Sequence, residues 1–201
     1  MENHIIDGYV EDAEFLIPSF ESVNSSELLS HVIKYIPKSG QLIEIGSGTG
    51  RDAAWLASNE LKVLAVEPVA EFRNAGKKLH INPNIDWVDD SLPSLSRVRS
   101  LHVSYDAALL VSVWQHVKPE DKCTSLLNIY SVLNKGSKLI ISVRLGPGSP
   151  KRKCYETTPQ NTTLLAEQCG FNLIASYNAD SAQKSNQKSG VKWVWLIFEA
   201  Y

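Results

Sequence analysis

The feature that most constrains the fold of this chain is a glycine-rich segment, residues 46–50 (GSGTG), between an apolar run and a helical pattern. The apolar run, residues 41–45, is typical of a buried strand, and the helical pattern begins at Arg51. Glycine allows tight turns with positive φ and close approach of a ligand to the backbone. Such a turn also directs backbone N–H groups and the positive end of the helix toward an anionic or carboxylate-bearing ligand. The segment therefore predicts a strand–turn–helix unit that binds a ligand.

Further apolar runs alternate with helical patterns along the rest of the chain, as in βα units. Strands are predicted at residues 62–66, 85–88, 106–113 and 138–143, and helices at 51–58, 69–79 and 119–133 with a stop at 134–136. After a loop at residues 146–150, a helix at 159–169 precedes strands at 171–178 and 191–200, which flank a polar stretch. The pattern predicts a mostly parallel sheet that ends in an antiparallel hairpin.

Length and composition favour one domain over residues 1–201, because 201 residues with 43% hydrophobic and 21% charged residues are typical of a globular domain. Ahead of the first strand, residues 9–36 predict one or two helices, with residues 25–27 (SSE) placed to cap the second. We therefore expect an N-terminal helical cap, residues 1–36, over the active edge of a core formed by residues 37–201.

Charge and cysteine content exclude several classes of protein. The net charge of −2 argues against a wholly electrostatic nucleic-acid binder, and no apolar run approaches the ~20 residues of a membrane span. The start of the sequence has no basic segment followed by an apolar one, so we expect a cytoplasmic protein. The three cysteines form no CxxC pair, and neither a disulfide framework nor a metal site is expected.

Charge is also uneven along the chain. Residues 1–33 hold seven acids and no Lys or Arg, whereas basic residues outnumber acids between positions 144 and 192. This distribution fits either a basic rim facing an acidic cap or a solvated surface, and the solvated surface is favoured because scattered lysines are usually solvated.

An acidic residue ends the second predicted strand. Glu67 lies 21 residues after Gly46, where its carboxylate can accept both hydroxyls of a ribose. A dinucleotide-binding enzyme fits less well, because its G-x-G-x-x-G spacing would require glycine in place of Arg51. Together, the glycine turn and Glu67 favour a ribose-bearing cofactor.

Five blocks in order, IEIGSGTGRDAAWLA, VLAVEP, WVDDSLP, YDAALLVSVWQHV and LNKGSKLIISVR, resemble the class I S-adenosylmethionine-dependent methyltransferases. The resemblance covers roughly residues 41–201 and extends to a bacterial subgroup of unassigned substrate. It implies an α/β, Rossmann-like, doubly wound sheet of seven strands, mostly parallel with an antiparallel C-terminal strand. It also implies S-adenosylmethionine as cofactor and S-adenosylhomocysteine as product.

The resemblance implies a set of cofactor contacts near the glycine segment and the ends of the first strands. These residues are Glu44, Gly46, Ser47, Gly48, Gly50, Asp52, Glu67, Pro68, Val111 and one of Asp89 and Asp90. Glu67 would bind the ribose, and Asp89 or Asp90 the adenine amino group. Asp52 fits equally the capping of its helix and a place near the cofactor's ammonium group.

Residues 112–116 lie at and just past the end of the fourth predicted strand, where such enzymes face the transferred methyl group. The Asn/Asp-Pro-Pro-aromatic motif of DNA-base or glutamine methylation is absent. His116 is a candidate proton acceptor or a structural histidine that holds the loop by a hydrogen bond. Trp114 is a candidate for the pocket wall or for a cation–π contact, although a large aromatic is more often core. Arg144 completes the catalytic candidates.

Substrate-side candidates lie in loops expected above the same edge: Tyr9, Arg144, Arg152 and Tyr155. Arg144 suits a carboxylate or phosphate. Its alternative is a salt bridge to an N-terminal acid. For Arg152, an exposed loop charge is favoured. Tyr9 belongs either to a lid or to the packing.

The sequence as a whole predicts a methyltransferase that acts on O, N or S of a small-molecule acceptor. The alternatives are an RNA or protein methyltransferase that docks on the basic stretch 151–192, and a non-catalytic module that binds S-adenosylmethionine. Nucleic acid is a disfavoured partner and a membrane is not expected. The acceptor's identity and charge and the oligomeric state stay open.

Overall fold

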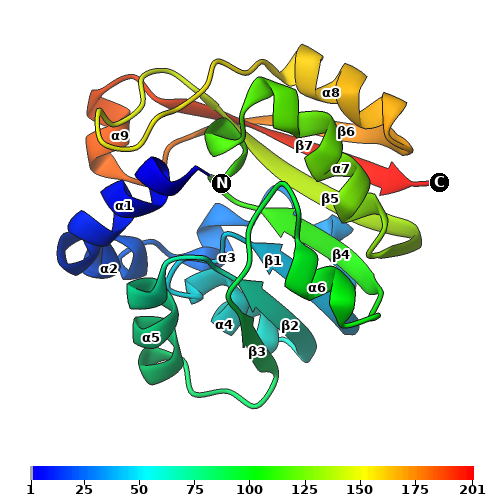
Figure 1. Cartoon of the computed structure of the whole chain (residues 1–201), viewed down its shortest axis with the longest axis horizontal. Helices are drawn as coiled ribbons and strands as arrows, with labels where there is room; N and C mark the ends of the chain where they lie inside the picture. Colours follow the sequence, from blue (N-terminus) through cyan, green and yellow to red (C-terminus); the bar gives the residue numbers. More distant parts are fainter. Residues whose placement is uncertain (1) are drawn as a thin grey trace.

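The computed structural model describes residues 2–201, which form a seven-stranded sheet in the order β3-β2-β1-β4-β5-β7-β6 (Figure 1). The strands are β1 Gly40–Ile45, β2 Leu61–Val66, β3 Ile85–Val88, β4 Tyr105–Leu110, β5 Leu133–Leu145, β6 Phe171–Asp180 and β7 Lys192–Ala200. Strands β1 to β5 pair in parallel, and β7 runs antiparallel to both β5 and β6. The predicted fold class, a doubly wound sheet with an antiparallel C-terminal strand, is confirmed.

Helices connect the strands and precede the sheet. They are α1 Asn3–Glu11, α2 Ala13–Glu21, α3 Ser25–Leu28, α4 Arg51–Ala57, α5 Ala70–Leu79, α6 Ser96–Ser100, α7 Lys122–Tyr130, α8 Pro159–Gln168 and α9 Lys184–Lys188, with 3₁₀ turns η1 Ile33–Tyr35, η2 Trp114–His116 and η3 Pro119–Asp121. The sequence analysis missed α6 and α9, because both are short and polar.

Two predicted boundaries are wrong for local reasons. The strand expected at 106–113 ends at Leu110, because Ser112 has φ +60° and the turn η2 follows. The helix expected at 119–133 is a 3₁₀ turn followed by α7, and Leu133 already belongs to β5. The N-terminal helices begin earlier than expected, and the cap of α3 is Asn24, whose side chain accepts from two backbone N–H groups.

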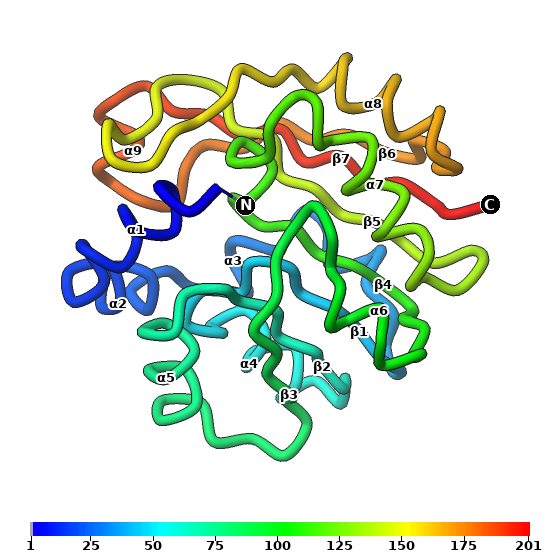
Figure 2. Tube along the Cα trace, viewed as in Figure 1, coloured from blue at the N-terminus to red at the C-terminus, as the bar shows by residue number. Residues whose placement is uncertain are grey.

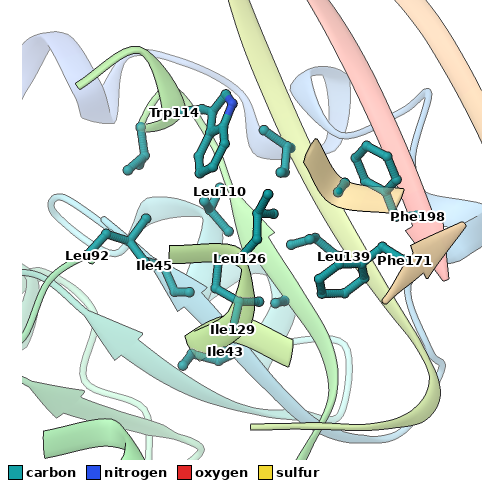
Figure 3. Close-up of a cluster of buried hydrophobic side chains, with 14 of the residues drawn as sticks. Ile43, Ile45, Leu92, Leu110, Trp114, Leu126, Ile129, Leu139, Phe171 and Phe198 are labelled. Carbon is teal, nitrogen blue, oxygen red and sulfur yellow. The ribbon is translucent and has the colours of Figure 1, made fainter. Parts of the chain in front are cut away.

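Alternate residues of each strand pack on opposite faces of the sheet, so the core has two halves. On one face, Ile43, Leu110 and Leu139 pack with Leu126 and other residues of α6, α7 and α8 (Figure 3). On the other face, strand residues from β1, β2, β4 and β7 pack with the side chains of α4 and the segment after α3. Because both faces of the sheet are covered, ligand access is confined to its edges.

The N-terminal helices lie at the carboxyl edge of the parallel strands. α1 packs against the loop of residues 146–156, where a Cβ atom at Gly8 would lie 2.3 Å from the backbone oxygen of Lys151, and α2 lies near α5 (Figure 2). Ala13 and Leu16 of α2 pack with Val69 and Phe72 at the start of α5. The helical segment thus covers the edge predicted to be active. No helix within residues 2–201 is long and apolar enough to cross a membrane.

Close packing around Gly76 fixes the position of α5. A Cβ atom there would lie 2.3 Å from Cη2 of Trp87 and 2.4 Å from the backbone oxygen of Thr49, which belongs to the glycine turn. We expect Gly76→Ala to lower the free energy of unfolding by about 1–3 kcal/mol, although alanine favours a helix by about 1 kcal/mol. Urea unfolding measures the change.

The matched control is Lys77→Ala, an exposed position on the same helix, for which we expect a change within about 0.5 kcal/mol. A Gly76→Ala protein as stable as the parent would contradict the inferred close contact.

Candidate active site

A cavity of about 630 Å³ runs along the carboxyl edge of the sheet, within the range of small-molecule sites. Its walls come from the segments that follow β1, β2 and β4, from the end of β5, from the N-terminal helices, and from Trp193 and Trp195 of β7. Most of the predicted site residues line it: Tyr9, Glu44, Gly46, Ser47, Gly48, Asp52, Glu67, Pro68, Val111, His116, Arg144 and Arg152. Residues from distant parts of the sequence are therefore brought to one place, as predicted.

The glycine turn forms part of the cavity wall. Its glycines have positive φ, a backbone conformation that residues with side chains rarely adopt. Gly46 has φ +73°, and a Cβ atom there would lie 2.4 Å from Cγ2 of Val113. Gly50, also at φ +73°, begins α4 against the ring of Trp87 and does not line the cavity. Gly46 therefore keeps the turn close to the segment after β4.

Glu67 joins the glycine turn to the end of β2. Its Oε2 accepts from the N–H of Gly48 at 2.8 Å, and its Oε1 accepts from the N–H of Val69 at 2.8 Å. Burial raises the pKa of Glu67 to about 7, although both backbone hydrogen bonds act in the opposite direction. Each oxygen keeps capacity to accept a further hydrogen bond.

Two more buried carboxylates lie at this end. Asp52 pairs with Arg51 through two hydrogen bonds, at 2.9 and 2.6 Å, and accepts from Ser25 Oγ at 2.6 Å. The structure therefore shows Asp52 bonded to the first residue of its own helix and to α3, and its predicted place near the ammonium group of the cofactor stays a prediction. Burial and the charge of Asp52 raise the pKa of Glu44 well above its usual range.

Unpartnered polar atoms also mark the cavity. Among residues 2–201, three buried side-chain atoms lack a hydrogen-bond partner, namely Glu44 Oε2, Ser47 Oγ and Gln115 Oε1. All three residues line the cavity. Because a buried polar group without a partner is costly, their clustering in one place indicates a binding site.

The segment after β4 adjoins the glycine turn in the cavity wall. Ser112 donates its N–H to Ser142 Oγ at 2.7 Å and accepts from Gln115 Nε2 at 2.6 Å. These bonds hold Ser112 at a positive φ that non-glycine residues rarely adopt, and such backbone strain is found mostly at functional sites. The turn carries Gln115 and His116 into the cavity wall.

His116 and Tyr9 form a hydrogen-bonded pair. The Nδ1 of His116 lies 2.8 Å from the carbonyl oxygen of Lys153, which only accepts, so Nδ1 carries the proton. The unprotonated Nε2 accepts from the Tyr9 hydroxyl at 2.9 Å. Burial lowers the pKa of His116 to about 4, with smaller contributions from the charges of Arg144 and Arg152, and burial raises the pKa of Tyr9. The pair is therefore neutral at pH 7.

The N-terminal acids pair with the loop after β5. Asp12 forms an ion pair with Arg152 and lies 2.9 Å from Lys151, and Arg152 also stacks over the ring of Tyr9. The favoured interpretation of this charge as solvated surface holds for Lys151, whose side chain is 53% exposed, and is wrong for Arg152, because Asp12 at the end of α1 lies against it. The Arg152 side chain is 17% exposed, which also corrects the expectation of an exposed loop charge.

Arg144 lies at the end of β5, beside Trp193 of β7. Its Nε and Nη2 donate to the carbonyl oxygen of Pro147 at 3.1 and 2.6 Å, and Nη2 lies 3.3 Å from Asn186 Oδ1. The alternative of a salt bridge to an N-terminal acid is not found within residues 2–201, where Glu2, Glu11 and Asp12 pair with other residues.

Besides Gly50, four candidate residues lie outside the cavity. Trp114 is wholly buried in the core and donates to Thr162 Oγ1 at 3.0 Å, so the prediction that it walls the pocket is wrong (Figure 3). Tyr155 donates its hydroxyl to Glu2 and does not face the cavity. Asp90 accepts from three backbone N–H groups around α6, and Asp89 pairs with Arg73 and Arg97. Neither aspartate lines the cavity, so the structure gives no support to the predicted adenine contact.

Sequence reasoning missed several wall residues. Gln115 and Ser142 stood beside predicted residues without a motif of their own, and Trp193 and Trp195 were noted only as part of a strand. The two tryptophans are two residues apart in the strand, and this spacing was a signal that they lie on the same face of the sheet. In the structure they pair with Arg144 and Ser142 of β5. Within residues 2–201, no group of three or more His, Cys, Asp or Glu side chains could hold a metal ion.

Comparison with known proteins agrees with this architecture. A family model described as a methyltransferase domain matches residues 43–141. An uncharacterized methyltransferase of Alkaliphilus oremlandii is 29% identical over 178 residues, which cover 80% of this chain and 75% of that protein.

Two solved structures share the fold. The 1,6-didemethyltoxoflavin-N1-methyltransferase of Burkholderia thailandensis, with bound 1,6-didemethyltoxoflavin and S-adenosylhomocysteine, superposes with a TM-score of 0.76 at 17% identity, over 98% of this chain and 88% of that one. A TehB-like S-adenosylmethionine-dependent methyltransferase of Corynebacterium glutamicum has a TM-score of 0.68 at 16% identity, over 100% of both chains. The family model, the relative and the shared fold agree: the chain resembles the class I S-adenosylmethionine-dependent methyltransferases in sequence and has their fold.

Proposed function

We propose that this enzyme transfers a methyl group from S-adenosylmethionine to an O, N or S atom of a small molecule and releases S-adenosylhomocysteine. The observation that carries the proposal is one cavity with two chemically different ends. Buried carboxylates surround the glycine turn at the end formed by β1 and β2, and Arg144 lies at the end formed by β5, with the Tyr9–His116 pair between them and Arg152 beside Tyr9. The two ends suit a cofactor and an acceptor, respectively.

The residues around the glycine turn fit the cofactor. Glu67 keeps acceptor capacity for the ribose hydroxyls, and the backbone of Gly46 and Gly48 allows close approach. The unpartnered Glu44 Oε2 and Ser47 Oγ would meet polar groups of the methionine part. Bound there, S-adenosylmethionine supplies a methyl group on a positively charged sulfur, ready for in-line displacement.

The acceptor end would align the acceptor and take its proton. Neutral His116 presents an unprotonated Nε2, held in orientation by the bond from Nδ1 to Lys153. An acceptor O–H, N–H or S–H takes the place of the Tyr9 hydroxyl as donor to Nε2, and its proton passes to His116 as the methyl group is transferred. Alignment within the cavity supplies much of the acceleration.

A small acceptor is favoured over RNA or protein. The basic loop that would form a docking face has its Lys151 and Arg152 paired with acids of α1 and its neighbour Asp12. Tyr9, Leu16 and Phe20 of α1 and α2 form part of the cavity wall, so an acceptor has to fit beneath these helices. The structural neighbour from Burkholderia thailandensis likewise binds a small acceptor, 1,6-didemethyltoxoflavin.

Glu67→Ala is expected to abolish cofactor binding. A ligand at 100 times its Kd adds about 2.7 kcal/mol to stability, and each kcal/mol raises the melting midpoint of a domain this size by roughly 2–4 °C. S-adenosylmethionine and S-adenosylhomocysteine should raise the midpoint of the parent by several degrees, and NAD should not. The shift should vanish in Glu67→Ala and persist in Asp89→Ala, whose carboxylate lies outside the cavity. Equal shifts in both variants would remove Glu67 from the cofactor site.

Affinity for S-adenosylhomocysteine is expected to fall as the pH drops below about 7. The pKa of Glu67 is about 7, and hydroxyl donors bind the ionised carboxylate better than the protonated one. Ligand binding therefore releases a proton below this pH, and calorimetry should show Kd rising by up to about tenfold per pH unit. Glu67→Gln should bind weakly with a smaller pH dependence. The same pH dependence in both proteins would assign the titration to another group.

His116→Ala is expected to lower turnover at least about tenfold, because a positioned base contributes about 10²–10⁴, while the affinity for S-adenosylhomocysteine stays nearly unchanged. Methyl transfer from radiolabelled S-adenosylmethionine to the small-molecule fraction of a cell extract measures turnover. Tyr155→Phe serves as the control, since this tyrosine lies outside the cavity. Unchanged turnover in His116→Ala would return His116 to a structural role.

A further inference from the structure

Arg144 differs from the other two arginines of the cavity in having no carboxylate partner. Arg51 pairs with Asp52, and Arg152 pairs with Asp12. Among residues 2–201, no carboxylate oxygen lies within 4.0 Å of the Arg144 guanidinium, and its Nη1 has no hydrogen-bond partner. Arg144 is half-buried and lines the cavity. A partly desolvated cation therefore faces the site without a counter-charge.

The guanidinium is also held in place. Two hydrogen bonds to the Pro147 carbonyl fix one edge, and the ring of Trp193 lies 5.5 Å from the guanidinium carbon. A held guanidinium loses little conformational entropy when it binds an anion, and its N–H groups suit a carboxylate or phosphate. Arg144 is thus organised for binding while Nη1 stays available.

Arg144 lies at the acceptor end of the cavity. Its positive charge acts on His116, Tyr9 and Cys154, all of which line the same cavity. Gln115, also in the wall, has a buried Oε1 with no partner and is 4% exposed. A ligand at this end therefore meets one cationic donor and one unfilled acceptor near the Tyr9–His116 pair.

The acids of the molecule do not offset this charge. The buried carboxylates of Glu44, Asp52 and Glu67 belong to the glycine-turn end of the cavity. Three acids of the cap, Glu2, Glu11 and Asp12, pair with Lys118, Lys151 and Arg152. The remaining two acids of the wall, Glu27 and Asp180, are exposed to solvent, where their charges are screened.

We propose that the methyl acceptor is an anion whose carboxylate or phosphoryl group binds Arg144, while a hydrogen-bond donor of the same molecule binds Gln115 Oε1. This inference rests on the proposed function, since it assigns the chemical class of the acceptor at that site. Arg144 is then a specificity-determining residue: it selects acids over their neutral analogues and orients the acceptor toward His116.

Anion binding to the enzyme saturated with S-adenosylhomocysteine tests the proposal. The probes are acetate, benzoate and inorganic phosphate, with acetamide and benzamide as neutral analogues, followed by tryptophan fluorescence and by the melting midpoint. We expect the anions to bind the parent and the amides not to bind. Arg144→Gln should weaken anion binding by about tenfold or more, and Arg144→Lys should weaken it less. The ranking of benzoate and phosphate distinguishes a carboxylate from a phosphoryl acceptor.

Lys184→Gln is the matched control, because it removes one positive charge from exposed helix α9 outside the cavity wall. It should bind the anions as the parent does. No anion binding by the parent, equal binding by parent and Arg144→Gln, or an equal loss in Lys184→Gln would overturn the inference.

The failure of this inference and the failure of the proposed function are separable. Stabilisation by S-adenosylhomocysteine reports on the cofactor end alone, and both Arg144 variants should retain it. If that stabilisation is present but the parent does not bind the anions better than the amides, only the inference that the acceptor is an anion is wrong. If Arg144→Gln does not fold, the comparison of acids with amides in the parent and in Arg144→Lys still shows whether the site selects anions.

Discussion

The buried carboxylate of Glu67 links elements on which the rest of the site depends. By accepting from Gly48 and Val69, it connects the turn after β1 to the start of α5. Phe72, one turn further along α5, packs with Leu16 of the N-terminal cap. The same carboxylate that shapes the glycine turn therefore also positions the helix against which the cap packs. Burial raises the pKa of Glu67, because a buried charge is costly. The protein therefore keeps this binding site for hydrogen-bond donors at a cost in folding stability.

The cap is held by contacts of two kinds. Apolar packing of Ala13, Leu16 and Phe72 anchors α2, whereas Asp12, Arg152 and the Tyr9–His116 hydrogen bond hold α1 over the acceptor end. Partly exposed ion pairs contribute at most about 1 kcal/mol, so α1 is held more weakly than the strands of the sheet. Local opening of such an element costs less than global unfolding. The cap is thus suited to admit an acceptor while the glycine turn keeps its geometry.

Local patterns in the sequence predict much of this fold and part of the site. The positions of the apolar strands, the glycine turn and Glu67 could be predicted from periodicity and spacing over short stretches of sequence, which depend little on tertiary contacts. Side-chain direction does not follow in this way. Trp114 and His116 are two residues apart in one 3₁₀ turn, yet one enters the core and the other the cavity. Asp90 is engaged by α6, a helix too short to be predicted.

The separation of charge along the cavity follows from the topology. The parallel strands β1 and β2 end in Glu44 and Glu67, and β5, beyond β4 in the sheet, ends in Arg144. Since a sulfonium cofactor is attracted to the carboxylates and an anionic acceptor to the guanidinium, each ligand is drawn to its own end. Under this proposal the reacting atoms meet between them, beside the strained turn at Ser112 and the proposed proton acceptor His116. Under the proposed function, this one sheet edge supplies binding, alignment and proton removal.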